Sequence, residues 1–297
     1  MPISKVLTPQ LVLDHKCLLG EGPVWDFHNN TICWIDILGG QIHQYSIDKK
    51  THFVIPVHRM IGSMAICNDG NFIAAVKDGF AFISRDGKTI DNITDPESHL
   101  PGNRFNDGKC DPLGRFWAGT MSLSEEPNAG SLYMIDKDLK VTKQLSGSTI
   151  SNGLAWSSDR KTVYYIDTPT SQIVSFDYDE STGKISDRKV VMKIAAADGY
   201  PDGMTIDSEG MLWVAHWDGW QVSRWDPSTG EKILKITMPV ARVTSCTFGG
   251  PSLEDFYITT ARKELTEEQL KAQPLAGGLF VIKECGYKGM RAKEFIR

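Results

Sequence analysis

Alternation of apolar and polar side chains dominates this chain and predicts short β-strands along its whole length. Runs rich in β-branched and aromatic residues are separated by turns that contain Gly, Asn or Asp, a pattern typical of antiparallel hairpins. One short segment, residues 265–273 with the sequence LTEEQLKAQ, favours a helix. We therefore expect an all-β protein in which this helix decorates a loop.

The strand pattern recurs as six hairpins, whose sequences are ICWIDILGGQIHQYSID, NFIAAVKDGFAFISRDG, RFWAGTM…GSLYMIDKD, TVYYIDTPTSQIVSFDYD, MLWVAHWDGWQVSRWDP and DFYITTARK…GGLFVIK. Another short strand precedes each hairpin, in LGEGPVWD, MIGSMAICNDG, FNDGKCDPLG, SNGLAWSSDR, PDGMTIDSEG and VTSCTFGGPS. The copies follow one another at about 40 to 50 residues, which is the blade period of a β-propeller.

The repeats predict a six-bladed β-propeller with a central metal-containing pocket. Six blades of three or four strands use nearly all 297 residues, so we expect a single domain over residues 1–297. Such a ring must be closed. The early run QLVLDHKCLL is the expected outer strand of the last blade, paired after GGLFVIK.

Composition and charge narrow the class of partner. The chain is 41% hydrophobic and 23% charged, as expected of a globular protein, and its net charge of −5 with scattered cations disfavours a nucleic-acid or anionic-membrane partner. No apolar run reaches the ~18 residues of a membrane span, and residues 1–16 lack the apolar core of a signal peptide. We expect a cytoplasmic protein. The sequence does not indicate an oligomeric state.

The six cysteines are widely spaced and form no C-x-x-C pair. This spacing predicts reduced, mostly buried thiols instead of a disulfide framework, and no histidine pattern accompanies any of them to suggest a catalytic cysteine.

Propeller geometry predicts where polar side chains gather. The innermost strand of each blade lines the axis and pairs antiparallel with the next strand, so the start of the first strand and the end of the second face one opening. From the first strands we expect a ring of Glu21, Arg104, Asn106, Asp107, Asn152 and Asp202. From the second strands we expect Asp36, Lys77, the segment after Met121, Asp167, His216, Trp217 and Arg262.

Three residues in this ring, Glu21, Asn152 and Asp202, each stand directly before a glycine in a different repeat. For each one alone a turn is the simpler interpretation, because Asn-Gly and Asp-Gly are common turn dipeptides. Together they offer three oxygen donors around one axis. Hard cations such as Ca²⁺ and Mn²⁺ prefer this set, whereas a closed structural zinc site would use Cys and His.

Other polar and aromatic residues keep two interpretations. His216 is as consistent with an interior hydrogen-bonded histidine as with a substrate ligand, and Trp217 and Trp220 suit either a ring-shaped ligand or packing within the blade. Glu125 and the neighbouring Glu126 are expected first in a solvated loop.

Taken together, the motifs resemble those of the regucalcin, gluconolactonase and luciferin-regenerating-enzyme family of six-bladed propellers. The resemblance covers essentially the whole chain and rests on LGEGPVWD, NRFNDGKCDPLGRFWAGTM, GSLYMID, SNGLAWSSD, GYPDGMTIDSEGMLWVA and TSCTFGGPSLEDFYITTA. The stretch YITTARKELTEEQLKAQPLAGGLF is most similar to bacterial sugar lactonases, such as pentonolactonases.

The resemblance implies one divalent cation (Ca, Mn, Mg or Zn) held by the same three residues, Glu21, Asn152 and Asp202. It also implies that Arg104 and Asn106 bind substrate oxygens. Animal members carry an acidic substrate-binding residue shortly after GTM, whereas SLSEEP follows here, so Ser122, Ser124 or Glu125 is expected in that role. This departure leaves the identity of the sugar open.

We expect a metal-dependent sugar lactonase whose small-molecule substrate is an aldonolactone. The cation would polarise the lactone carbonyl, and Asp202 would be the general base for the attacking water. Two alternatives stay open: a hydrolase of another ester, aryl lactone or phosphotriester, and a non-enzymatic calcium-binding propeller.

Overall fold

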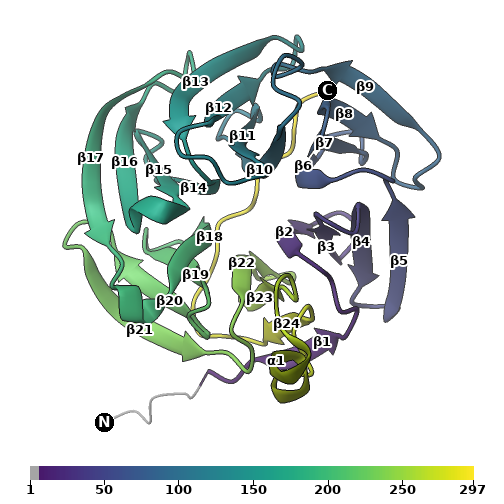
Figure 1. Ribbon diagram of the computed structural model, residues 1–297, viewed down its shortest axis with the longest axis vertical. Helices are drawn as coiled ribbons and strands as arrows, with labels where there is room; N and C mark the ends of the chain where they lie inside the picture. Colours follow the sequence, from purple (N-terminus) through teal and green to yellow (C-terminus); the bar gives the residue numbers. More distant parts are fainter. Residues whose placement is uncertain (1–6) are drawn as a thin grey trace.

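Six four-stranded antiparallel sheets surround a central axis in the computed structural model, which describes residues 7–297 (Figure 1). The six-bladed all-β architecture predicted from the repeats is confirmed. In each of the first five blades the strands follow one another outward in chain order, because short turns connect antiparallel neighbours.

The strands of blades one to three are β2 (Gly20–Asp26), β3 (Thr31–Asp36), β4 (Gln41–Ser46), β5 (Thr51–Pro56), β6 (Ile61–Ile66), β7 (Phe72–Val76), β8 (Gly79–Ile83), β9 (Ile90–Thr94), β10 (Asn103–Cys110), β11 (Phe116–Ser122), β12 (Gly130–Ile135) and β13 (Val141–Ser148). Those of blades four and five are β14 (Ser151–Trp156), β15 (Thr162–Asp167), β16 (Gln172–Tyr178), β17 (Ile185–Lys193), β18 (Tyr200–Ile206), β19 (Leu212–Trp217), β20 (Gln221–Asp226) and β21 (Glu231–Thr237). The sixth blade contains β22 (Val243–Gly249), β23 (Asp255–Thr260), β24 (Leu279–Ile282) and β1 (Gln10–Leu13).

Both ends of the chain help to close the ring. Strand β1 pairs antiparallel with β24 at the outer edge of the sixth blade, as predicted from QLVLDHKCLL. The C-terminal segment then crosses one face of the ring (Figure 1). On that face Ser208 N donates to Lys288 O at 2.8 Å and Asn68 N donates to Phe295 O at 2.9 Å, which connects blades five and two. The sequence interpretation did not anticipate this crossing.

Helical structure in the described residues is short. Helix α1 (Glu267–Ala272) lies within the predicted segment and begins with a capping box between Thr266 and Gln269. Two 3-10 turns, η1 (Thr168–Thr170) and η2 (Ala196–Asp198), connect strands in blades four and five. None of the helices within residues 7–297 combines the length and the apolar character needed to cross a bilayer.

Large apolar side chains fill the space between neighbouring sheets. Trp34, Trp117 and Trp213 stand in the second strands of three blades and are fully buried. Two of them donate an indole N–H to an aspartate at the end of the first strand, Trp117 to Asp111 at 3.0 Å and Trp213 to Asp207 at 2.8 Å. Burying these rings therefore leaves neither indole N–H unsatisfied. All six cysteines are buried as thiols, and residues 7–297 contain no disulfide.

Candidate active site

Each innermost strand contains a β-bulge near its start, at the position of the repeated glycine motif. The pairing with the second strand shifts register there in all six blades, between Glu21 and Val24, Ile61 and Ser63, Phe105 and Gly108, Asn152 and Leu154, Pro201 and Met204, and Val243 and Ser245. A bulge bends the strand and redirects a side chain. The pre-glycine residues thus lie within strands, and the turn interpretation does not hold for them.

Close approach between blades explains the glycines themselves. A Cβ on Gly203 would lie 2.8 Å from the Cα of Ser245 in the next innermost strand, and one on Gly153 would lie 2.9 Å from Asp202 O. Neither contact is tolerable for a side chain. Glycine therefore lets the innermost strands converge on the axis and brings the preceding polar residues together.

A cavity of about 270 Å³ opens at the starts of the innermost strands. The residues that line it include six of those predicted from the sequence to bind metal or substrate: Glu21, Arg104, Asn106, Glu125, Asn152 and Asp202. Ser122 is not among the lining residues. Its hydroxyl lies 2.9 Å from that of Ser124, which is not among the lining residues either.

Two buried carboxylates face this cavity. Burial is the main cause that raises the pKa of Glu21 well above its usual range, with the nearby charges of Asp202 and Asp107 as further causes. Burial and Asp107 likewise raise the pKa of Asp202, whereas Arg104, Lys263 and a hydrogen bond with Asn152 oppose the rise. Concentrating acidic groups in a low-dielectric channel is unfavourable unless a cation neutralises them.

Hydrogen bonds fix the amide of Asn152. The hydroxyl of Thr168 donates to Pro201 O at 2.8 Å, so it can only accept from Asn152 Nδ2, which lies 2.8 Å away. Asn152 Oδ1 then accepts from Asn106 Nδ2 at 3.1 Å and keeps a second lone pair. Asn106 is therefore as much a positioning group for Asn152 as a candidate substrate ligand.

Arg104 lies buried beside these groups. Its Nη1 donates to Asn106 Oδ1 at 2.7 Å and to Phe105 O at 2.9 Å. Burial lowers the pKa of Arg104 to about 10, against the opposing charges of Glu125, Glu21 and Asp202, so the guanidinium stays charged at neutral pH. Its remaining N–H groups are suited to bind substrate oxygens.

Most of the acidic and basic residues expected at the ends of the second strands have other roles. Asp36 accepts from Leu18 N at 2.8 Å, and Asp167 accepts from Ile150 N at 2.9 Å, so both stabilise connections between strands. His216 is fully buried against Ser223, which agrees with the interior-histidine interpretation. Lys77 donates to two backbone carbonyls on the rim of the ring.

The cavity wall also contains residues that sequence reasoning missed. Thr168 follows the predicted Asp167 by one position, and Lys263 lines the cavity where Arg262 was expected. Lys263 Nζ lies 3.3 Å from Glu125 Oε1. Trp217, which the sequence did place in the ring, contributes an aromatic surface and lies against the guanidinium of Arg242, 4.6 Å from its ring centroid. Both Thr168 and Lys263 stand one residue after the position expected from the sequence, so extending each predicted strand end by one residue would have found them.

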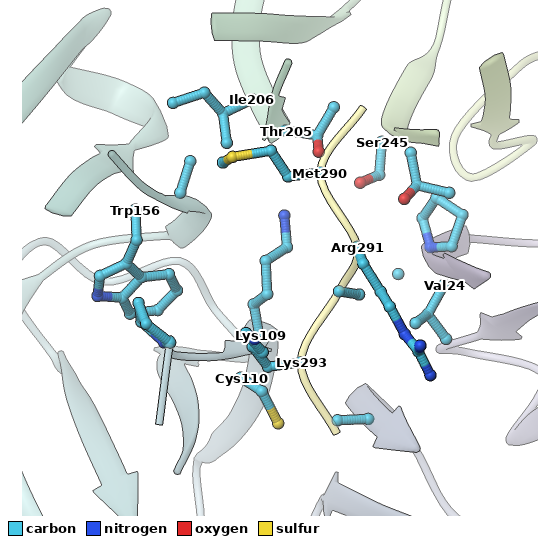
Figure 2. A pocket seen from close by; sticks show the side chains of 18 of the residues that line it. Val24, Lys109, Cys110, Trp156, Thr205, Ile206, Ser245, Met290, Arg291 and Lys293 are labelled. Carbon is cyan, nitrogen blue, oxygen red and sulfur yellow. The ribbon is translucent and has the colours of Figure 1, made fainter. Parts of the chain in front are cut away.

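A second cavity, of about 340 Å³, is lined by the later parts of the innermost strands and by the C-terminal segment. Figure 2 shows Lys109 extending into it toward Met290, with Arg291 of the C-terminal segment to one side. Lys109 Nζ donates to Met204 O at 2.7 Å. Asp107 lines this cavity and not the first one, which differs from the predicted ring. Because it lacks a group of convergent oxygen donors, this cavity is the weaker candidate.

The donor set in the first cavity fits a hard divalent cation. Two carboxylates and one amide oxygen come from three blades, and a cation between them would relieve the repulsion that raises both carboxyl pKa values. Asn106 and Thr168 supply the outer contacts that orient a ligand. Glu21, Asn152 and Asp202 are thus the residues that could hold the metal.

Comparison with known proteins points to one family. The model of the SMP-30/Gluconolactonase/LRE-like region matches residues 19–262. YvrE of Bacillus subtilis (strain 168), whose name assigns it provisionally to the sugar lactone lactonases, is 40% identical over 270 residues, 91% of this chain and 92% of that protein. Regucalcin of Xenopus laevis is 38% identical over 291 residues, 96% of this chain and 97% of its own.

Among solved structures, a regucalcin from Agrobacterium tumefaciens strain C58, described as a calcium-binding protein, superposes with a TM-score of 0.92 at 30% identity and covers 97% of each chain. The family resemblance noted in the sequence is therefore confirmed. The chain belongs to the SMP-30/gluconolactonase/LRE-like family of β-propellers.

Proposed function

We propose that this protein is a divalent-metal-dependent hydrolase that opens a sugar lactone to its aldonic acid. The observation that carries the proposal is the axial cavity in which Glu21, Asn152 and Asp202 lie beside the guanidinium of Arg104. The relationship to YvrE supports lactone hydrolysis. A volume of about 270 Å³ also lies near the lower end for ligand pockets, which favours a small substrate.

Charged and aromatic groups on the cavity wall suit a polyhydroxylated ring. Arg104 would donate to substrate oxygens, and Glu125 with Lys263 offers an acceptor and a donor for hydroxyl groups at the mouth. Trp217 would pack against the C–H face of the ring. Glu125 is the residue that we assign to the acidic substrate-binding role, because Ser122 lies outside the cavity lining.

Asp202 is the general base of the proposed reaction. It would accept a proton from water as the water oxygen bonds to the acyl carbon, and that proton would pass to the ring oxygen when the ring C–O bond breaks. A cation held by Glu21, Asn152 and Asp202 would supply Lewis-acid stabilisation of negative charge on the carbonyl oxygen. Arg104 would keep the lactone in place during both bond changes.

A non-enzymatic calcium-binding role is the second candidate. It is supported by the identity with regucalcins and by the description of the Agrobacterium structure as a calcium-binding protein. The same oxygen donors serve both candidates, so the metal site alone does not separate them. Turnover does.

A lactone panel tests the proposal. Protein freed of metal with a chelator would be assayed on pentono- and hexonolactones, aryl lactones and a phosphotriester, before and after restoring Ca²⁺, Mn²⁺, Mg²⁺ or Zn²⁺. We expect metal-dependent hydrolysis of sugar lactones. Tight metal binding without turnover on any substrate would favour the calcium-binding candidate, and preference for aryl esters would replace the substrate class.

A further inference from the structure

Three of the seven histidines come together on the first blade, and none of them lines the axial cavity. His43 lies in β4, His52 in the neighbouring β5, and His15 in the segment that leads from β1 to β2. One ring nitrogen from each lies within 4.8 Å of the others. The cluster therefore joins three chain segments, one of which closes the ring.

The distances suit nitrogen ligation. His43 Nδ1 lies 3.1 Å from His52 Nε2. Bonds of about 2.0–2.1 Å to a tetrahedral Zn²⁺ would separate two such nitrogens by about 3.3 Å. The ring of His15 packs edge-on against His43 and His52, with centroids 4.4 Å and 5.2 Å away. His15 is half-buried, and one of its ring nitrogens lies within 4.8 Å of a nitrogen on each of the other two rings.

The surroundings leave the required lone pairs available. His15 Nε2 lies 3.3 Å from Gln41 Oε1, an acceptor, so the proton of a neutral His15 is on Nε2 and its Nδ1 is free to ligate. His43 Nε2 can direct its proton toward the sulfur of Cys17 at 3.9 Å, so that His43 Nδ1 can bind a cation in place of its hydrogen bond with His52 Nε2. Metal-binding histidines commonly have such a partner on the second ring nitrogen.

The ring of His43 is buried, and that of His52 is partly buried. The ring of Trp34 stacks on His43 with centroids 4.8 Å apart. Burial is the main cause that lowers the pKa of His43 to about 3 and that of His52 to about 4, and the neighbouring imidazoles add to both shifts. Burial raises the pKa of the Cys17 thiol to about 12, so sulfur is a neighbour and not a thiolate ligand.

We propose that His15, His43 and His52 form a second metal site, which takes a borderline transition cation of the Zn²⁺ class. Three imidazoles suit Zn²⁺, Cu²⁺ and Ni²⁺ and discriminate against Ca²⁺ and Mg²⁺, which require oxygen ligands. The site differs in chemistry from the oxygen site on the axis. Its cation would tie the ring-closing segment to blade one and stabilise the folded protein by binding it preferentially.

Zinc stoichiometry and thermal unfolding test the site. Metal-free wild type, His15→Gln, His52→Gln and the control His99→Gln, which alters an exposed histidine, would be equilibrated with Zn²⁺ in the presence of excess Ca²⁺. We expect both cluster variants to bind one Zn²⁺ fewer than the wild type and the control. Zn²⁺ at about 100 times its Kd should raise the unfolding temperature by roughly 4 °C or more in the latter two only.

Cu²⁺ electron paramagnetic resonance of the wild type gives a readout that needs no substitution. Bound Cu²⁺ should show nitrogen hyperfine splitting that the axial oxygen donors cannot produce. Equal Zn²⁺ content in wild type and both cluster variants would overturn the proposal. Absence of nitrogen splitting would do so as well, and the cluster would then be a set of packed, hydrogen-bonded imidazoles.

Discussion

Replacing Asp202 by Asn separates its role as a base from its role as a metal ligand. The side chains are nearly isosteric, and the bulge at Pro201–Met204 depends on the backbone and on Gly203. Asn retains an oxygen donor but cannot accept the proton of the attacking water. Loss of general-base assistance lowers rates by about 10² to 10⁴, which corresponds to roughly 2.7 to 5.5 kcal/mol in the activation barrier.

Glu21→Gln is the matched control. It removes the same charge from the same cavity, and the pKa of the Glu21 carboxyl is raised by the same main cause, burial. Each substitution should weaken cation binding, because each leaves one carboxylate in place of two. Excess cation should therefore restore most of the turnover of Glu21→Gln while Asp202→Asn stays at least a hundredfold below the wild type.

The assay follows acid release from a lactone with a pH indicator, corrected for spontaneous opening, over a range of metal concentrations. Metal content is measured in parallel so that turnover is compared at full occupancy. The wild-type profile should lose activity as pH falls and Asp202 is protonated, and this acidic limb should be missing in the variant. If saturating metal restored Asp202→Asn as fully as Glu21→Gln, Asp202 would be a ligand alone and the base would lie elsewhere.

Three further predictions address the groups around the metal. Arg104→Ala should lower kcat/KM by about 5- to 150-fold, because about 1 to 3 kcal/mol of hydrogen bonding to the substrate is lost, and its metal content should stay near normal. Asn106→Ala should also lower the affinity for the metal, because it releases Asn152. Equal metal loss in both variants would contradict this division of roles. The hydroxyl of Thr168 orients Asn152, so Thr168→Val should weaken Mn²⁺ binding about 10- to 100-fold, whereas Thr168→Ser should preserve it. Calorimetry measures both affinities, and an unchanged affinity in the valine variant would argue against that role. The pKa values of Glu21 and Asp202 are raised, so the folded metal-free protein holds these protons more tightly than the unfolded chain does. The stability of the metal-free protein should therefore fall as pH rises from about 4 through the raised pKa values. Added cation should restore the unfolding temperature most at alkaline pH, and a benefit independent of pH would refute the linkage.

The sequence by itself determined the number of blades, the ring closure and the candidate metal ligands. Alternating strands with a fixed period are a local property, so the six hairpins and the outer strand at residues 10–13 could be predicted. The repeated pre-glycine position likewise marked Glu21, Asn152 and Asp202, because equivalent positions in a closed ring face one axis.

Tertiary structure alone decided how those positions are used. The dipeptides before glycine look like turns in sequence, and only the approach of neighbouring blades makes them bulges that face the channel. Whether a strand-end residue reaches the cavity depends on the conformation of the following loop. That is why Thr168 and Lys263 line the wall while Asp167 caps backbone groups nearby.

The histidine cluster also depends on tertiary structure, which brings together residues from separate parts of the chain. His15, His43 and His52 follow no metal-binding spacing in the sequence. They meet because β1 joins the last blade and the chain then returns to the first, while the register of β4 and β5 places two of the rings on one face. Contacts of this kind join side chains from three separate segments of the chain, so no local pattern of residues reveals them.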